Sequence, residues 1–250
     1  MRKKINLFDE IYEDEALEFI KKHEPPEGYY VAFSGGKDSI VVYDLVKRSG
    51  VKHFVYYSCT GIDPPEVVHF IKQNYSEVIF VKPDESFYDG IIRHGLPTIF
   101  KRWCCRLLKE ISLKKIPLAN RIMGIREEES SKRKKRGRIS TIKSQKVTHY
   151  KPIFHWNEYH IWDYIEKYNL KYPSLYDEGF NRIGCVVCPF HSSKEKEKYK
   201  SRWPYIFRAF EKKAHELYTI KDKGSFAGES FEEWLDYYYK NGFLKSNKEK

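Results

Sequence analysis

Short apolar runs along the chain alternate with longer segments in which apolar positions recur at helical spacing. The apolar runs predict buried strands at residues 29–33, 51–58, 77–81 and 120–123. The helical spacing predicts helices at residues 8–23, 39–47, 65–75, 85–95, 102–115, 157–168, 193–219 and 229–241. Strands that alternate with helices build a doubly wound parallel sheet, so we expect an α/β fold with a helical C-terminal part.

A glycine-rich turn joins the first predicted strand to the helix that follows it. Its residues are Ser34, Gly35, Gly36, Lys37, Asp38 and Ser39. Glycines let the backbone approach an anion, the start of a helix attracts negative charge, and Lys37 adds a cation. An ordinary strand-to-helix turn is the alternative, but this composition between strand and helix favours phosphate binding.

Ligands of parallel α/β sheets bind at the carboxyl ends of the strands. We therefore expect three loops to surround one crevice, namely residues 34–39, 59–63 and 124–133. Arg126 follows Gly124 directly after a predicted strand, and a guanidinium is suited to bidentate contact with phosphate or sulfonate. The basic run from Lys132 to Arg138 has three interpretations that the sequence leaves open. It is a loop that closes over a bound nucleotide, a loop that binds a nucleic-acid backbone, or a solvated loop without a ligand.

The cysteines predict a metal or redox site rather than a disulfide framework. Four of the five form two pairs, which are Cys104 with Cys105 and Cys185 with Cys188. Four thiolates can hold either tetrahedral zinc or an iron–sulfur cluster, and the spacing leaves both open. The fifth, Cys59, follows the second predicted strand and is either a nucleophile or a packing residue.

Charge and hydropathy limit the cellular setting. The net charge of +11 suits an anionic partner such as a nucleotide or a nucleic acid. No apolar run reaches the length of a membrane span, and the N-terminus lacks the apolar segment of a secretory signal. We therefore expect a cytoplasmic protein without membrane contact.

These motifs together resemble the phosphoadenosine phosphosulfate (PAPS) reductase family of the adenine nucleotide alpha-hydrolase-like superfamily. The glycine turn matches the family's phosphate loop, Thr60-Gly61 matches its Asp-Thr-Gly motif in part, and Gly124-Ile125-Arg126 matches its Gly-x-Arg motif. The segments PIFHWNEYHIWDYI and YPSLYDEGFNRIGCVVCP are the most specific match. The resemblance covers about Tyr29 to Phe190 and implies a nucleotide-binding domain in residues 25–190. The helical patterns on either side predict an N-terminal helix in residues 1–24 and a helical extension in residues 191–250.

The resemblance also implies a reaction and its cofactor. Cys104, Cys105, Cys185 and Cys188 resemble the ligands of the [4Fe–4S] cluster in the adenosine phosphosulfate (APS) reductase branch. A sulfonucleotide reductase converts PAPS or APS to sulfite with electrons from a thioredoxin-like thiol donor, and the family is often homodimeric. The implied nucleotide ligands are the loop residues 34–39, Thr60, Gly61, Arg102, Gly124, Arg126 and Arg133.

Two features depart from the reductase pattern. Reductases of the family attack with a cysteine from a C-terminal Glu-Cys-Gly motif, whereas the printed sequence has no cysteine after Cys188, which leaves Cys59 as the nucleophile to test. The phosphate loop is intact, although many reductases have a degraded one. The alternative function is therefore an ATP- and Mg²⁺-dependent sulfurtransferase that inserts sulfur into tRNA or DNA.

Overall fold

The computed structural model describes residues 7–111, 116–221 and 230–242 of the chain. The chain divides into two compact units, and each is built from several segments. Unit 1 takes Met1–Tyr57, Glu66–Phe80 and Ile116–Arg182, and unit 2 takes Ser58–Pro65, Val81–Lys115 and Ile183–Lys250. The expected division into domains 1–24, 25–190 and 191–250 stays a prediction.

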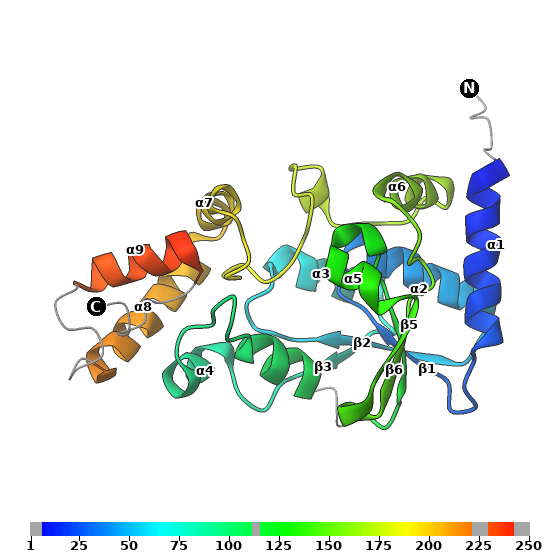
Figure 1. The fold of residues 1–250 in the computed structure, drawn as a ribbon. Coiled ribbons are helices and arrows are strands. Elements are labelled where there is room, and N and C mark those ends of the chain that lie inside the picture. The colour runs from blue at the N-terminus through cyan, green and yellow to red at the C-terminus, as the bar shows by residue number, and fades with distance from the viewer. Residues whose placement is uncertain (1–6, 112–115, 222–229, 243–250) are drawn as a thin grey trace. The chain divides into compact units, whose positions relative to one another are not determined.

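A six-stranded sheet in the order β3-β2-β1-β4-β6-β5 forms the centre of unit 1 (Figure 1). The strands are β1 (Tyr29–Ala32), β2 (His53–Ser58), β3 (Ile79–Val81), β4 (Asn120–Met123), β5 (Ile139–Ile142) and β6 (Val147–Tyr150). β1 pairs in parallel with β2 on one side and with β4 on the other, and β4 pairs in parallel with β6. The predicted α/β fold is confirmed, and the strand order reverses between β1 and β4, where such sheets bind ligands.

The sheet is not parallel throughout. β5 runs antiparallel to β6, with Ile139 opposite Tyr150 and Ile142 opposite Val147. Neither strand was predicted, because ISTI and VTHY mix polar with apolar residues, as partly exposed strands do, and show no continuous apolar run. The predicted doubly wound parallel sheet thus carries one additional antiparallel strand at this edge.

The helices of unit 1 are α1 (Leu7–Lys22), α2 (Lys37–Ser49), α3 (Pro65–Asn74), α5 (Ser131–Arg136) and α6 (Glu158–Lys167). α2 carries the buried stripe Ile40, Val41, Leu45 and ends at Gly50, whose φ of 73° is the left-handed conformation that glycine adopts without strain. α1, α2 and α6 pack against one another, and an ion pair of 2.5 Å joins Arg48 on α2 to Glu13 on α1.

The regular elements in the described part of unit 2 are helices and the ends of two strands. It contains α4 (Phe87–His94), the π-helix η1 (Cys105–Ile111), α7 (Ser193–Arg202), α8 (Pro204–Lys221) and α9 (Phe231–Asn241). The segment predicted as a helix at residues 102–115 is mainly a π-helix in its described part; residues 112–115 lie outside the described residues. The helix predicted at 193–219 is two helices, because Pro204 cannot donate the hydrogen bond that would continue α7.

None of the helices in the described ranges combines the length and the apolar character that a membrane crossing needs.

Candidate functional site

The loop between β1 and α2 is shaped for an anion. Gly35 has a φ of 72°, and a Cβ there would lie 2.9 Å from the side chains of Ile71 and Val67 on α3, so only glycine fits. The Ser39 hydroxyl donates to the Gly36 carbonyl at 2.8 Å and fixes the turn. The N-cap residue of α2 is Gly36, which has no side chain of its own to cap the helix. The first amides of α2 and the positive end of its dipole are therefore suited to hold a phosphate.

Lys37 is the cation of this loop, and its side chain is held by several contacts. Its side chain is 5% exposed, and its Nζ donates to the Asn181 carbonyl at 2.8 Å and lies 3.3 Å from a Glu158 carboxylate oxygen. The backbone N–H of Lys37 donates to the Tyr176 hydroxyl at 2.9 Å. A tyrosine hydroxyl thus occupies one of the donors that a phosphate oxygen would use.

Tyr176, Asn181 and Glu158 were not among the residues predicted for the site. Tyr176 lies in the sequence LYDEG, which is part of the segment that resembles the family. That resemblance was the one feature of the sequence that could have indicated a position of Tyr176 beside the phosphate loop.

The loop after β4 meets the loop after β1. A Cβ on Gly124 would lie 2.9 Å from the backbone carbonyl of Asp38, so the two loops touch at this glycine. Arg126 is 4% exposed and donates from Nε to Asp38 at 2.5 Å and from a second nitrogen to Glu128. The predicted proximity of these two loops is present in unit 1. In this structure Arg126 is paired with the carboxylates of Asp38 and Glu128. The predicted contact between Arg126 and a nucleotide phosphate therefore stays a prediction.

Arg133 lies on the short helix α5, where it pairs with Glu129 one turn earlier. Its part in nucleotide binding is not tested by this contact and stays a prediction.

Unit 2 holds the loop that follows β2. Thr60 is 2% exposed, and its hydroxyl donates to Asp63 at 2.7 Å, while Gly61 has a φ of 77° that suits the turn. Cys59 precedes them, with its backbone N–H bonded to the Val81 carbonyl at 2.8 Å and its side chain half-buried.

The first cysteine pair lies at the start of the π-helix η1, which begins at Cys105. Helices of this kind are rare and are frequent at functional sites. A hydrogen bond between the two thiols raises the pKa of Cys104 and lowers that of Cys105. The Arg102 guanidinium adds to the second effect, since it donates to the Cys105 sulfur at 3.7 Å. It also lies over the Phe190 ring at 4.8 Å. Cys105 is thereby favoured as a thiolate.

The second pair lies beside the loop after β2. The Cys185 thiol donates to Asp63 at 3.6 Å, and the amide of the next residue, Val186, donates to the Ile62 carbonyl at 2.8 Å. Burial raises the pKa of Cys185 to about 12, against the influence of the nearby Lys109 ammonium. Lys109 in turn has its pKa raised, first by Cys185 and then by Asp63 and Cys105. Asp63 and Lys109 are therefore parts of this site that the predicted ligand set did not contain.

All four paired cysteines lie in unit 2 and influence one another electrostatically, since Cys185 and Cys188 both contribute to the raised pKa of Cys104. In the part of the chain that the structure describes, no three His, Cys, Asp or Glu side chains are drawn together closely enough to hold a metal ion. The soft thiol donors, with lysine and arginine to balance their charge, fit an iron–sulfur cluster or zinc. Binding of either requires the thiols to move closer together.

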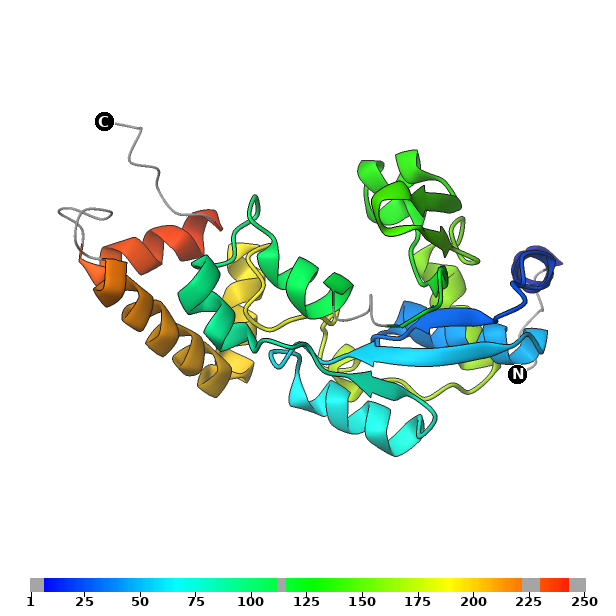
Figure 2. The same ribbon diagram turned by 90° about the horizontal axis from the view of Figure 1, so that it is seen from below.

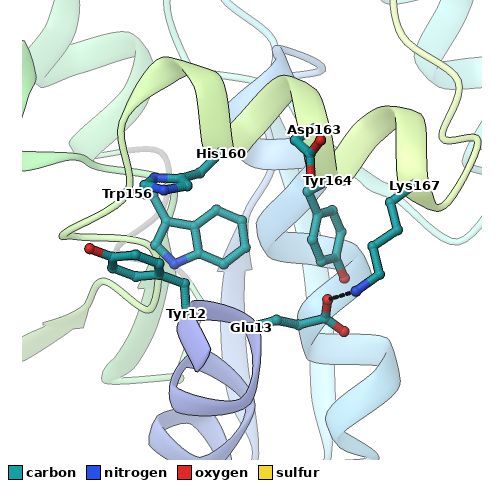
Figure 3. Close-up of a pocket in the computed structure, with 7 residues that line it drawn as sticks. All are labelled: Tyr12, Glu13, Trp156, His160, Asp163, Tyr164 and Lys167. Carbon is teal, nitrogen blue, oxygen red and sulfur yellow. Dashed lines mark hydrogen bonds and ion pairs between the residues drawn. The ribbon is translucent and has the colours of Figure 1, made fainter. Parts of the chain in front are cut away.

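Figure 3 shows a hollow between α1 and α6 of unit 1, which sequence reasoning missed. It is lined by Tyr12, Glu13, Trp156, His160, Asp163, Tyr164 and Lys167. Burial alone would raise the pKa of Glu13, but hydrogen bonds from Tyr168, Lys167 and Arg48 lower it. The Lys167 ammonium donates to Glu13 at 2.9 Å. Because this charge is already paired inside the protein, we assign the hollow to helix packing and not to a ligand.

Comparison with known proteins supplies the family. The model of the phosphoadenosine phosphosulfate reductase domain matches residues 28–191. An uncharacterized protein of Methanocaldococcus jannaschii is 34% identical over 215 residues, which cover 80% of this chain and 44% of that protein. This chain thus spans less than half the length of that relative.

A further relative and a solved structure resemble this chain. The adenosine 5′-phosphosulfate reductase of Anoxybacillus flavithermus is 31% identical over 181 residues, covering 69% of this chain and 77% of that enzyme. The crystal structure of PAPS reductase from Candida auris in a phosphate complex aligns with a TM-score of 0.55 at 16% identity, over 73% of this chain and 97% of that one, which supports the fold. The match over residues 28–191 covers most of the chain, and the protein belongs to the phosphoadenosine phosphosulfate reductase domain family.

Proposed function

We propose that this chain reduces an adenosine sulfonucleotide, APS or PAPS, to sulfite and the corresponding adenosine phosphate. The family match carries the proposal, because residues 28–191 include both the phosphate loop of unit 1 and the four paired thiols of unit 2. The start of α2 supports it, because its N-cap residue is a glycine and the helix start offers amides and dipole charge to the nucleotide phosphates.

The chemistry follows from thiol nucleophilicity. A thiolate, which we assign to Cys59, attacks the sulfonate sulfur. The bond between that sulfur and the phosphate oxygen breaks, and the adenosine phosphate leaves with the bonding electrons. The enzyme then carries a cysteine S-sulfonate. A thiol of a thioredoxin-like dithiol attacks the cysteine sulfur and sulfite leaves. The second thiol of the donor resolves the mixed disulfide, so the dithiol supplies the two electrons.

The paired cysteines are proposed to hold a [4Fe–4S] cluster, whose ligands would be Cys104, Cys105, Cys185 and Cys188. Such a cluster would supply structural cross-linking and a local electrostatic field. The basic side chains around the thiols, Arg102 and Lys109, favour the thiolate forms that iron requires. We also propose a cytoplasmic homodimer, in line with the family resemblance.

The proposal is tested on the anaerobically purified chain. Calorimetric titration with APS, PAPS and ATP–Mg²⁺ is run beside measurement of sulfite and pyrophosphate release. Thiol-dependent sulfite release from APS or PAPS supports the reductase, and the preferred ligand shows whether a 3′-phosphate is recognised. Binding of both sulfonucleotides without any sulfite release would refute it.

Matched cysteine variants separate the roles of the thiols. Cys59→Ser is expected to abolish sulfite release and keep the iron content and visible absorption of the parent. Cys104→Ser is expected to lose both iron and absorption. Full activity of Cys59→Ser would remove Cys59 from the mechanism, and an unchanged spectrum of Cys104→Ser would exclude the cluster assignment.

A second candidate is an ATP-dependent sulfurtransferase that adenylates tRNA or DNA with the help of Mg²⁺. The intact loop favours it, since Ser34, Gly35 and Ser39 keep the full set of anion-binding features. Pyrophosphate release from ATP that depends on added RNA or DNA, without sulfite formation, would select this function over the reductase.

A further inference from the structure

The segment at the outer edge of the unit 1 sheet carries charge of one sign, which is positive. Residues 131–151 contain nine lysines and arginines and no aspartate or glutamate. The segment forms α5, then β5, the turn to β6, and β6 itself, which are drawn in green in Figures 1 and 2. Among the described strands β5 is the last of the sheet, and cations lie at both of its ends.

Most of these cations are unpaired in the described parts of unit 1. Arg133 pairs with Glu129, and Arg138 pairs with Glu15. No described carboxylate lies within ion-pair distance of the exposed remainder, and we name this set the basic edge: Lys132, Lys134, Lys135, Arg136, Lys143 and Lys146. Four of them lie on α5 at one end of β5, and the other two lie in the turn at its opposite end.

A second layer of cations lies behind the basic edge. Arg121 on β4 is in register with His149 on β6, and Tyr30 on β1 is in register with Arg121. Paired positions of a sheet share one face, so these side chains form a row across the strands. The Arg121 guanidinium lies 5.1 Å from the centre of the Tyr30 ring. Lys151, 2% exposed, follows β6 and donates to the Gly137 carbonyl at 2.6 Å and the Ser140 hydroxyl at 2.9 Å.

The two layers repel each other. Burial and the positive charges of Arg121, Lys151 and Arg136 lower the pKa of His149 to about 4. Burial and Arg136 lower the pKa of Lys151 to about 8. In the described residues, the largest influences on both pKa values are burial and positive charges. Charge of one sign that is crowded in this way is relieved by a bound anion.

We propose that the basic edge binds the backbone phosphates of a nucleic-acid strand. The length of the surface supports this ligand class. A four-residue strand spans about 13 Å, so the cations at the two ends of β5 are too far apart for the phosphates of one nucleotide. A nucleic-acid strand carries one phosphate per about 3.4 Å of helix axis and places about four along that length.

A membrane surface fits less well. α5 has the sequence SKRKKR and offers no apolar face to insert between lipids. Ile139 is the one large apolar side chain among the exposed residues of β5 and β6, with 41% of its surface exposed. The inference goes beyond the proposed reductase activity and does not depend on it, since it concerns a different surface of unit 1.

The test uses the full chain and fluorescently labelled single strands of about 20 nucleotides, as RNA and as DNA of the same sequence. Binding is followed by anisotropy at about 50 and 200 mM KCl. With about four phosphates neutralised, the salt slope is about −2.8, so affinity is expected to fall about 50-fold between these salt concentrations. The RNA and DNA arms identify which nucleic acid is preferred.

A charge-reversal pair tests the assignment to this surface. Lys143→Glu with Lys146→Glu is expected to weaken binding at least about 10-fold and to flatten the salt slope by about 1.4. The matched control, Lys194→Glu with Lys212→Glu, makes the same change in net charge on exposed lysines of α7 and α8 and is expected to stay within about twofold of the parent. Lys143→Gln with Lys146→Gln replaces the test pair if the reversal does not fold.

Three results would overturn the proposal. They are absence of binding to both strands at the lower salt concentration, an equal loss in the test pair and the control pair, and binding to vesicles of anionic lipid in preference to nucleic acid. Sulfite release is measured separately, so failure of this inference and failure of the reductase proposal remain distinguishable.

Discussion

Lys151 is a buried lysine close to other positive charges, and its lowered pKa should make the stability of the protein depend on pH. Its ammonium is buried behind β5 and makes two hydrogen bonds, to the Gly137 carbonyl and the Ser140 hydroxyl. Methionine at this position keeps the length of the side chain and removes the charge. Lys151→Met therefore isolates the free energy that this charge costs in the folded protein.

The magnitude follows from the pKa. Burial and Arg136 lower the pKa of Lys151 from the ordinary value of 10.5 to about 8, which corresponds to about 3 kcal/mol. A base with a lower pKa in the folded state binds fewer protons when folded than when unfolded. The free energy of unfolding therefore rises with pH between about 8 and 10.5, and the full cost is present below about 8. Between pH values of about 7 and 9.5, the recovered stability is about 2 kcal/mol.

The assay is urea unfolding of the parent and of Lys151→Met at these two pH values. Other groups titrate equally in both proteins, so the difference between parent and variant cancels them. That difference is expected to move by about 2 kcal/mol in favour of the parent at the higher pH. Lys146→Met, at an exposed lysine, is the control and is expected to show no such movement. A parent–variant difference that stays constant within about 0.5 kcal/mol would refute the reasoning that Lys151 is a desolvated and repelled charge.

Three further predictions concern the loop and the helices of unit 1. Tyr176→Phe frees the backbone N–H of Lys37 and is expected to raise the affinity for inorganic pyrophosphate about fivefold in calorimetry; unchanged or weaker binding would show that the hydroxyl does not compete with phosphate. Gly124→Ala forces a methyl group against the Asp38 backbone and is expected to cost about 1–3 kcal/mol in urea unfolding and to weaken nucleotide binding, which wild-type stability would contradict. Glu13→Ala removes the carboxylate between α1 and α6 and is expected to cost about 2–3 kcal/mol, near the low end for a buried pair because its basic partners are about one-third exposed; a cost below about 0.5 kcal/mol would contradict this.

Features with a local signal were predicted well. The apolar run before Ser34 and the glycines after it predict a strand, a turn and a helix start, and the structure has β1, the loop and α2 there. Tertiary contacts between distant residues carry no such signal. The Tyr176 hydroxyl reaches the Lys37 amide across 139 positions, and Arg126 reaches Asp38 across 88. Local patterns cannot specify these pairs, because each depends on how the whole sheet assembles.

At the cysteine site, one feature was predicted from the sequence and another was not. The pairing of Cys104-Cys105 with Cys185 and Cys188 predicted that distant thiols would share one region, and all four lie in unit 2. The π-helix that begins at Cys105 was expected as an ordinary helix, since the apolar spacing of seven residues cannot distinguish the two periods. The identity of the metal stays a prediction, because four thiolates can hold either zinc or an iron–sulfur cluster.

β5 is also the last strand of its sheet, and within the described part of the chain no strand pairs with its outer side. Such an edge is a template on which identical chains can add strands and aggregate. Lysines and arginines at both ends of β5 make two copies repel each other when their edges align. The charges that we assign to nucleic-acid binding therefore also protect the fold against self-association, and a homodimer of this protein is expected to form through another surface.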